Sequence, residues 1–249
     1  MTAAGALPRQ RAYVDLHCHT SSSFDSLADP RSVVRAAAAR GLTHLAITDH
    51  DRIDGALRAR DAAPGGLTVI IGEECRTADG DLICVFLQRP VAPGRPALQT
   101  IAEVRAQGGL VGIPHPFDRF RNSMSQRARS RHSLADLATQ VDWVESYNAR
   151  LLGGGNDRAA DFARAQALPG VAVSDAHTVL EVADAYSVLT GQPGTPDGLL
   201  AALANGVEVI PGRASYVVRL VIPVAKLIQR SRGNRRIAPA GPSAAGAGR

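Results

Sequence analysis

The feature that most constrains the fold of this chain is the alternation of short apolar runs with helical stretches. Helices are expected from Pro30 to about Gly41, where a capping Asp29 precedes proline, and over 53–63, 96–107, 156–167, 199–205 and 220–230. Strands are expected at 13–17, 43–48, 67–72, 81–87, 110–113, 143–147, 170–174 and 207–210. This alternation predicts an α/β fold with a mostly parallel sheet. About seven such units fit a barrel as well as an open sheet.

Composition narrows the class of protein. Hydrophobic residues make up 45% of the 249 residues, which is enough for a sizeable core. No apolar run reaches the roughly 18–20 residues that a membrane-spanning helix needs, and the first residues lack the apolar stretch of an export signal. Cys18, Cys75 and Cys84 are odd in number and have no disulfide-framework spacing. We therefore expect reduced thiols in a cytoplasmic protein without a membrane partner.

The net charge of +5 comes from the C-terminal end. Residues 225–249 hold six basic side chains and no acidic one, so the rest of the chain is close to neutral. We expect one folded domain over 12–220, and a terminal helix with a disordered tail rich in Arg, Gly, Ala and Pro over 221–249. Such a tail is expected to contact nucleic acid weakly.

Chemistry-bearing residues gather where the expected strands end. Five strands each end in His, Asp or Glu, in the stretches DLHCHT (15–20), ITDHD (47–51), GEE (72–74), PHP (114–116) and SDAH (174–177). The carboxyl ends of parallel strands meet at one edge of a sheet or barrel, and sites form there. His17 and His19 are two residues apart and are expected to point the same way. Imidazoles mixed with carboxylates, without organised thiolates, indicate Zn, Mn or Fe bound by N and O atoms.

These five motifs, in this order and spacing, resemble the PHP (polymerase and histidinol phosphatase) domain superfamily. The resemblance covers about residues 12–220 and is strongest to small bacterial stand-alone phosphoesterases, which include 3′,5′-nucleotide bisphosphate phosphatases and 5′–3′ exonucleases. It implies a distorted (β/α)7 barrel with two or three divalent metal ions at the strand ends.

The resemblance also implies ligands for each metal. The first metal would be held by His17, His19, Glu73 and Asp175. Glu73 would bridge to a second metal that His115 also holds, and a third would lie between Asp25, His50 and His177. Asp49 would orient a ligand as part of the catalytic set.

One position departs from the family pattern. Many members carry a histidine on the strand after the bridging glutamate, where it completes the second metal site. Here that strand reads DLICVFLQ, and Ile83 or Cys84 stands near the place of the histidine. Cys84 is either a soft substitute ligand or a packed core thiol, with the core the simpler reading.

The expected activity is hydrolysis of phosphomonoesters by a metal-activated water, with nucleotides or the 5′ ends of short oligonucleotides as substrates. Arg119 and Arg121, directly after His115, are expected to bind phosphate and assist catalysis, because guanidinium groups pair with phosphate oxygens. Asn148 and Arg150, beyond another strand end, are expected to bind substrate in the same way. For each arginine the alternative is an ordinary solvated loop residue.

Other functions stay open at this point. A 5′–3′ exonuclease, a weakly active or non-catalytic metal-binding module that docks on nucleic acid through its tail, and a histidinol-phosphatase-like enzyme would share the same motifs. An amidohydrolase would usually need a carboxylated lysine between its metals, and the one lysine of this chain, Lys226, lies near the tail.

Overall fold

The computed structural model describes residues 10–118, 123 and 133–238. Its core is one nine-stranded sheet with the order β7-β6-β5-β4-β3-β2-β1-β8-β9. The strands are β1 (Arg11–Asp15), β2 (His44–Ile47), β3 (Thr68–Arg76), β4 (Asp81–Val85), β5 (Leu110–Ile113), β6 (Trp143–Asn148), β7 (Gly170–Val173), β8 (Tyr186–Thr190) and β9 (Val207–Ile210). Strands β1 to β3 are mutually parallel, as are β5 to β7, whereas β4 and β8 run antiparallel to their neighbours.

The sheet curls until β7, at one end, reaches β8, the strand next to the other end. The amide of Ala172 in β7 donates to Ser187 Oγ in β8 at 2.8 Å, and that hydroxyl donates back to the Ala172 carbonyl at 3.1 Å. The result is a nearly closed barrel, which confirms the expected α/β barrel class. Strand β8 was not among the expected strands, because its YSVLT sequence carries a serine that becomes buried only on closure.

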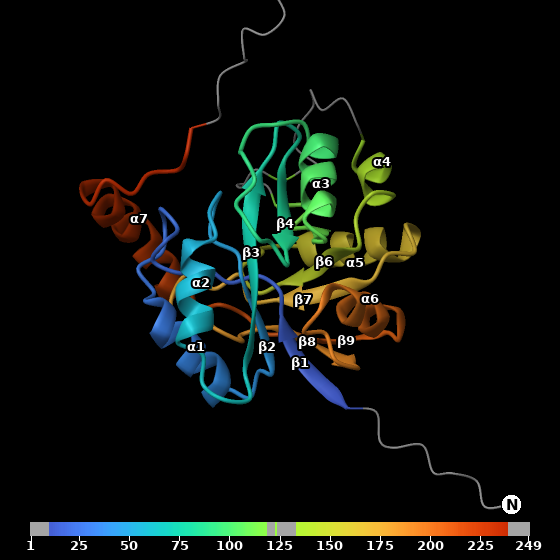
Figure 1. Ribbon diagram of the computed structural model, residues 1–249, viewed down its shortest axis with the longest axis horizontal. Coiled ribbons are helices and arrows are strands. Elements are labelled where there is room, and N and C mark those ends of the chain that lie inside the picture. The colour runs from blue at the N-terminus through green and yellow to red at the C-terminus, as the bar shows by residue number, and fades with distance from the viewer. Residues whose placement is uncertain (1–9, 119–122, 124–132, 239–249) are drawn as a thin grey trace, which may run out of the picture.

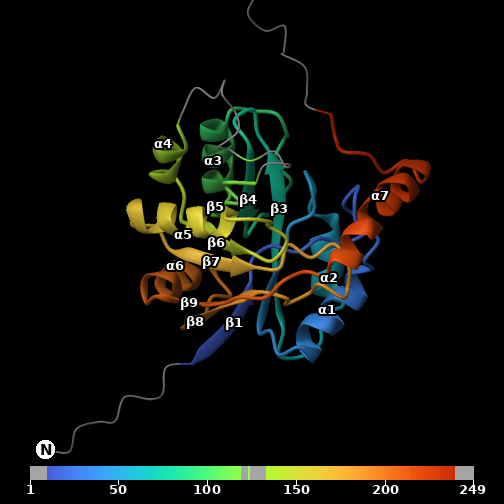
Figure 2. The ribbon, with the colours of Figure 1, turned by 180° about the vertical axis from the view of Figure 1, so that it is seen from behind.

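Seven helices are present in the described ranges: α1 (Pro30–Ala39), α2 (Asp54–Asp61), α3 (Ala97–Ala106), α4 (Leu134–Ala138), α5 (Gly155–Ala165), α6 (Pro196–Ala204) and α7 (Tyr216–Ser231). Helix α1 begins as the sequence predicts, because the Asp29 carboxylate accepts from the Ser32 amide at 3.0 Å and Pro30 follows it. Helices α1, α2 and α7 lie on one side of the barrel and α3 to α6 on the other (Figures 1 and 2). None of the described helices combines the length and the apolar character needed to cross a membrane.

The barrel interior is filled mainly by aliphatic side chains, with one large ring. Val14, Ile70, Ile83 and Trp143 belong to one fully or nearly fully buried cluster. Gly112 of β5 is required here, because a Cβ at that position would lie 2.1 Å from the Trp143 ring. This packed interior supports the strand ends from below, as in other barrels whose sites form at that end.

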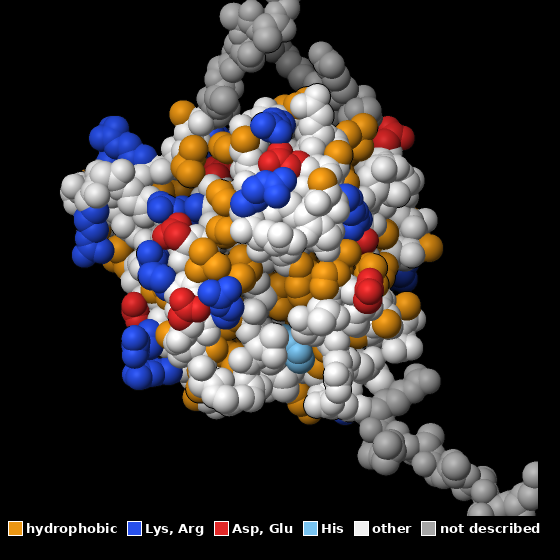
Figure 3. All heavy atoms as spheres, in the orientation of Figure 1, with side chains coloured by type: hydrophobic (Ala, Val, Ile, Leu, Met, Phe, Trp, Pro, Cys, Tyr) orange, Lys and Arg blue, Asp and Glu red, His pale blue; other side chains and the backbone are white. Residues whose placement is uncertain are grey.

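The first residues beyond α7 lie against the domain. Residues 232–238, expected in the disordered tail, follow α7 back onto the molecule, and the Asn234 amide donates to the Ser22 carbonyl at 3.0 Å. Composition alone missed this contact because a side-chain amide bonding to backbone needs no apolar residues. Figure 3 shows basic side chains gathered on the side of the molecule formed by α1, α2 and α7, with acidic ones between them. The last eleven residues lie outside the described ranges.

Candidate metal centre

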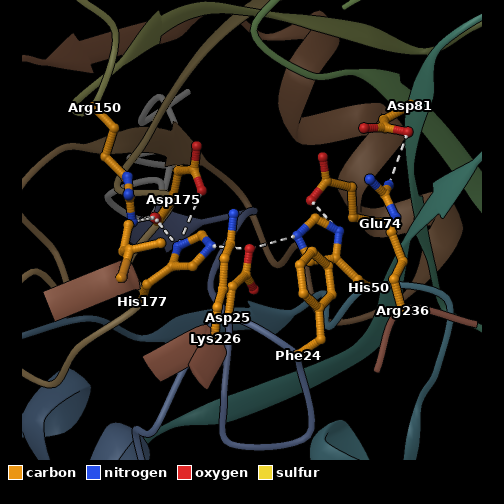
Figure 4. Close-up of a pocket in the computed structure, with 11 residues that line it drawn as sticks. Phe24, Asp25, His50, Glu74, Asp81, Arg150, Asp175, His177, Lys226 and Arg236 are labelled. Carbon is orange, nitrogen blue, oxygen red and sulfur yellow. Dashed lines mark hydrogen bonds and ion pairs between the residues drawn. The ribbon is translucent and has the colours of Figure 1, made fainter. Parts of the chain in front are cut away.

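The polar residues at the strand ends converge beside one cavity. The cavity has a volume of about 360 Å³, and Asp25, His50, Glu74, Asp175 and His177 line it (Figure 4). His17 and His19 lie just behind them and are fully buried. Most of the residues expected to hold metal are therefore brought together in space, although they come from five separate strand ends.

Glu74 lies at the centre of this cluster. Its Oε2 atom is 3.0 Å from His50 Nδ1 and 3.5 Å from the Nε2 atom of both His17 and His19. Its Oε1 atom is 3.2 Å from His115 Nε2. One carboxylate thus touches four imidazoles. It meets His17, His19 and His115 at Nε2, as a group shared between metal ions would. It meets His50 at Nδ1, on the far side of the ring from the Nε2 atom that faces Asp25.

The expectation placed Glu73 in this role, and the geometry contradicts it. The Glu73 carboxylate points to the other face of the sheet, where Oε1 accepts from Cys75 Sγ at 2.7 Å and from the Val91 amide at 2.9 Å. The expected strand ended at residue 72, but β3 continues to Arg76, and successive side chains on a strand point to opposite faces. Glu74, two residues beyond Gly72, is therefore the one that faces the cluster.

A first group of ligand atoms surrounds a point between His17 and His19. Their Nε2 atoms are 2.9 Å apart, and Asp175 Oδ1 is 3.6 Å from each. Together with Glu74 Oε2, these atoms form a compact N₂O₂ set within reach of a single ion. Zn, Mn and Fe all accept such mixed imidazole and carboxylate ligands.

A second group lies at the cavity surface. Asp25 Oδ2 is 3.4 Å from His50 Nε2 and 3.5 Å from His177 Nε2, which brings together the three residues expected at a third metal. Asp25 comes from the loop between β1 and α1, whereas His50 follows β2 and His177 follows β7. The loop of β1 therefore reaches across the barrel mouth to complete the group.

The position expected to hold the second metal, beside His115, has fewer ligand atoms than the two groups described above. It offers Glu74 Oε1 and His115 Nε2, but the residue paired with Glu74 on β4 is Ile83, which is buried in the apolar interior. Cys84 pairs with Glu73 instead and lies on the opposite face, so it cannot replace the absent histidine. Burial raises the pKa of its thiol, as expected for a packed core cysteine.

Hydrogen bonds fix which nitrogen each histidine presents to the cluster. His17 Nδ1 donates to Glu145 Oε1 at 2.6 Å, and His177 Nδ1 donates to the Asp175 carbonyl at 2.9 Å. Both rings therefore turn Nε2 toward the ligand groups, and in the neutral ring that nitrogen carries the lone pair. Carboxylates and carbonyls behind imidazole ligands commonly set their tautomer in this way. Glu145 was not among the expected site residues.

Asp49 acts on the cluster through an intermediary rather than directly. Its carboxylate accepts from the Thr20 amide at 2.6 Å, the Thr20 hydroxyl at 2.6 Å and the Ser23 hydroxyl at 2.8 Å. Because the single Ser23 proton goes to Asp49, Ser23 Oγ accepts from His19 Nδ1 at 3.0 Å. Asp49 thus orients His19 through Ser23. It is fully buried and does not line the cavity, so its side-chain contact with the ligand histidines runs through Ser23.

The electrostatics of the metal-free cluster are those of imidazoles around a shared anion. Burial would raise the pKa of Glu74, but the surrounding imidazoles, His50 foremost, hold it well below its usual range. Burial would lower the pKa of His17, but the Glu145 carboxylate raises it to about 9. His50 likewise has a pKa of about 9 despite burial, because of Glu74 and Asp25. Protons on these rings hold the place that a divalent cation would take.

Two further observations fit a bound cation. The Oδ1 atom of Asp25, whose Oδ2 faces His50 and His177, is buried and has no hydrogen-bond partner within the described part of the chain. His115 and Asp175 also have positive φ angles, at 26° and 52°, a region that non-glycine residues rarely occupy. Such strain concentrates at functional sites. The donor set, the unsatisfied atom and the backbone therefore all fit a metal centre.

The expected phosphate-binding residues have different outcomes. Asn148 does not face the cavity: it is buried, and its amide donates to Glu145 at 2.9 Å and to Asp175 at 3.0 Å, so both of its protons are used. Arg150 does line the cavity, beside His177 (Figure 4). Arg119 and Arg121 lie outside the described residues.

Comparison with known families identifies the family of the chain. Residues 15–153 match the model of the PHP domain, and residues 153–207 match that of the PHP-associated segment. The first match alone spans more than half of the chain. The chain therefore belongs to the PHP domain family.

Individual relatives share parts of the sequence. An uncharacterized protein of Methanocaldococcus jannaschii is 32% identical over 146 residues, which cover 54% of this chain and 81% of the relative. An error-prone DNA polymerase of Cutibacterium acnes is 47% identical over 64 residues, but these are 25% of this chain and only 6% of the polymerase. The shared stretch is thus a small part of a much larger enzyme.

Solved structures share the fold at low sequence identity. A two-domain protein from Bacteroides vulgatus, described as containing a predicted PHP-like metal-dependent phosphoesterase, superposes with a TM-score of 0.67 at 18% identity, covering 84% of this chain and 70% of that protein. A lesion-specific endonuclease from Pyrococcus furiosus gives 0.61 at 15% identity, covering 80% of this chain and 58% of the endonuclease. At these identities the likeness concerns the fold alone.

Proposed function

We propose that this chain is a metal-dependent phosphoesterase that hydrolyses phosphomonoesters, with nucleotides such as 3′,5′-bisphosphates, or the 5′ ends of short oligonucleotides, as its substrate class. The observation that carries the proposal is Glu74 with a group of ligand atoms on each side, at the edge of a cavity that Arg150 also lines. Membership of the PHP family supports the same reaction class.

Divalent metal ions bound here would lower the pKa of a bound water toward about 7 and neutralise the phosphate charge. The protein's part is to hold the ligands rigidly. Glu145 fixes the His17 tautomer, the Asp49–Ser23 pair fixes His19, and Glu74 contacts the first group directly and the Nδ1 side of the His50 ring of the second. Arg150 is assigned the outer phosphate oxygens, because its guanidinium is at the cavity and matches their geometry.

The ligand atoms also limit the choice of metal. They are nitrogens and carboxylate oxygens, which favours Mn, Zn or Fe over metals that need thiolates. The two well-supplied groups account for two ions. A third, between Glu74 and His115, would need water or substrate to complete it, because Ile83 replaces a ligand there.

An amidohydrolase reaction fits this centre less well. Lys226 does line the cavity, although its sequence position placed it near the tail, but it is exposed, and Glu74 already occupies the bridging position. A carboxylated lysine therefore has no place between the ligand groups. An exonuclease remains the second candidate, because the family relatives include polymerases and the fold neighbours include an endonuclease.

The test is a phosphate-release screen on the full chain with added Mn, using mononucleotides, nucleotide bisphosphates, sugar phosphates and short 5′-phosphorylated oligonucleotides. We expect release from small phosphomonoesters and its loss in His17→Ala, which removes a ligand of the first group. Shortened oligonucleotide products would instead support the exonuclease. Full phosphate release by metal-loaded His17→Ala would refute the proposed centre, and no hydrolysis by the wild type with any metal would favour a non-catalytic module.

A further inference from the structure

The C-terminal segment forms part of the wall of the cavity. Ile222 and Lys226, one turn apart on α7, and Arg236 beyond it line the same cavity as Asp25, His50 and His177. In Figure 4 Lys226 lies between His177 and His50, alongside Asp25. The segment that sequence reasoning assigned to a terminal helix and tail therefore faces the candidate metal centre.

This segment is fastened to the loop that carries Asp25. Gln229 is 2% exposed, and its amide donates to the carbonyls of Ser26 at 2.6 Å and Ser21 at 2.8 Å. The Asn234 amide adds the bond to Ser22 at 3.0 Å. A buried amide bonded to several carbonyls of one loop fixes the helix and the loop relative to each other.

The two cations that the segment brings to the cavity are engaged differently. Arg236 is held by carboxylates, at 3.3 Å from Asp81 and 3.7 Å from Asp51. The Lys226 ammonium lies 5.5 Å from the centre of the Phe24 ring and has no hydrogen bond or ion pair with any residue that the structure describes. Lys226 is also the one lysine among 28 basic residues. Because the Lys226 ammonium lines the cavity and forms no ion pair with a described residue, its charge is available to an anion there.

We propose that Lys226 binds an anionic oxygen of the substrate across the cavity from the metal ligands, and that Gln229 holds it in position there. Phe24 steadies the ammonium through a cation–π contact while leaving its three protons to the ligand. The inference rests on the proposed function for the identity of the substrate as a phosphate ester. Anion binding itself is measurable without turnover.

The first test is calorimetric titration of the Mn-loaded full chain with inorganic phosphate. Lys226→Met keeps the length of the side chain and removes its charge, and we expect it to weaken phosphate binding by about fivefold, as for a charged contact at a partly exposed site. Lys226→Arg should retain most of the affinity. The matched control is Arg230→Met, which removes the same charge from an exposed position one turn further along α7.

Unchanged phosphate affinity in Lys226→Met, or an equal loss in Arg230→Met, would overturn the inference, the latter by showing that only overall charge matters. Absence of phosphate binding to the wild type would also overturn it. If Lys226→Met weakens phosphate binding although the wild type hydrolyses no ester, the inference stands and the proposed function falls. If the wild type hydrolyses phosphate esters but Lys226→Met binds phosphate normally, the proposed function stands and the inference about Lys226 falls.

The role of Gln229 is tested by a double-mutant cycle. Gln229→Ala should weaken phosphate binding, and combining it with Lys226→Met should add little, because both changes remove the same contact. Gln192→Ala, on an exposed surface glutamine, is the control for loss of an amide. Additive losses would contradict the claim that Gln229 acts through Lys226.

Discussion

Replacing Glu145 by glutamine isolates the contribution of a residue that does not line the metal-centre cavity but bonds to His17, a proposed metal ligand. Glu145 Oε2 accepts from the His115 amide at 2.8 Å and from Asn148 at 2.9 Å, while Oε1 accepts from His17 Nδ1 at 2.6 Å. In the glutamine variant, the side-chain oxygen must take the place of Oε2, where it accepts from the His115 amide and from Asn148. The NH₂ group then takes the place of Oε1 and faces His17. His17 then accepts at Nδ1, and its proton moves to Nε2, where the metal should bind.

The expected cost follows from that tautomer. Loss of the acceptor behind a histidine ligand typically weakens metal binding by about 10- to 100-fold, or about 1.4–2.7 kcal/mol. We therefore expect Glu145→Gln to bind Mn or Zn 10- to 100-fold more weakly in competition with a chelating dye. Phosphate release should recover substantially when the metal concentration is raised.

The matched control is Glu103→Gln, which makes the same chemical change at a surface ion pair with Arg95. It should leave metal affinity unchanged. Metal binding by Glu145→Gln within twofold of the wild type would refute the assignment of Glu145 as the group that sets the His17 tautomer. A loss of activity that no metal concentration restores would also contradict it.

The remaining predictions concern the bridging carboxylate and the response to pH. Glu74→Gln should abolish metal-dependent phosphate release, because Glu74 contacts the ligand histidines. Glu73→Gln should keep the metal content measured by elemental analysis, because Glu73 faces Cys75. The opposite result would restore Glu73 as the ligand. In the metal-free protein His17 and His50 have pKa values raised to about 9 from 6.5, so the stability they contribute is complete below pH 6.5 and is lost as the pH rises through 9. The melting temperature in chelator should therefore fall between pH 6.5 and 9. The loss of unfolding free energy behind this fall is at most on the order of 3 kcal/mol per ring. The fall should disappear in Mn, because the metal ions replace the protons. A melting temperature in chelator that is flat or rises over this range would contradict the raised pKa values.

The convergence of the site could be predicted from sequence because parallel strands bring their carboxyl ends together. His17, His50, His115 and Asp175 each follow a recognisable apolar run, and strand geometry alone places them at one edge. The choice between Glu73 and Glu74 depended on where β3 ends. The apolar run stops at Gly72, four residues before β3 ends at Arg76, so the sequence does not show that the alternation of the strand extends through the pair.

The supporting residues could not be predicted in the same way. Glu145 lies 128 positions from His17 in the chain, inside an apolar strand that gives no sign of its partner. Asn148 looked available for substrate, but its two protons are used inside the cluster. The contact of Gln229 with the Asp25 loop is formed by one amide and backbone carbonyls, which leave no apolar or charge pattern in the sequence.

The central claim is that metal ions bind on both sides of Glu74, and anomalous diffraction from crystals grown with Mn tests it most directly. We predict one peak among His17, His19, Glu74 and Asp175 and another among Asp25, His50 and His177. Peaks beside Glu73, or no peak within the cluster at saturating Mn, would contradict the account.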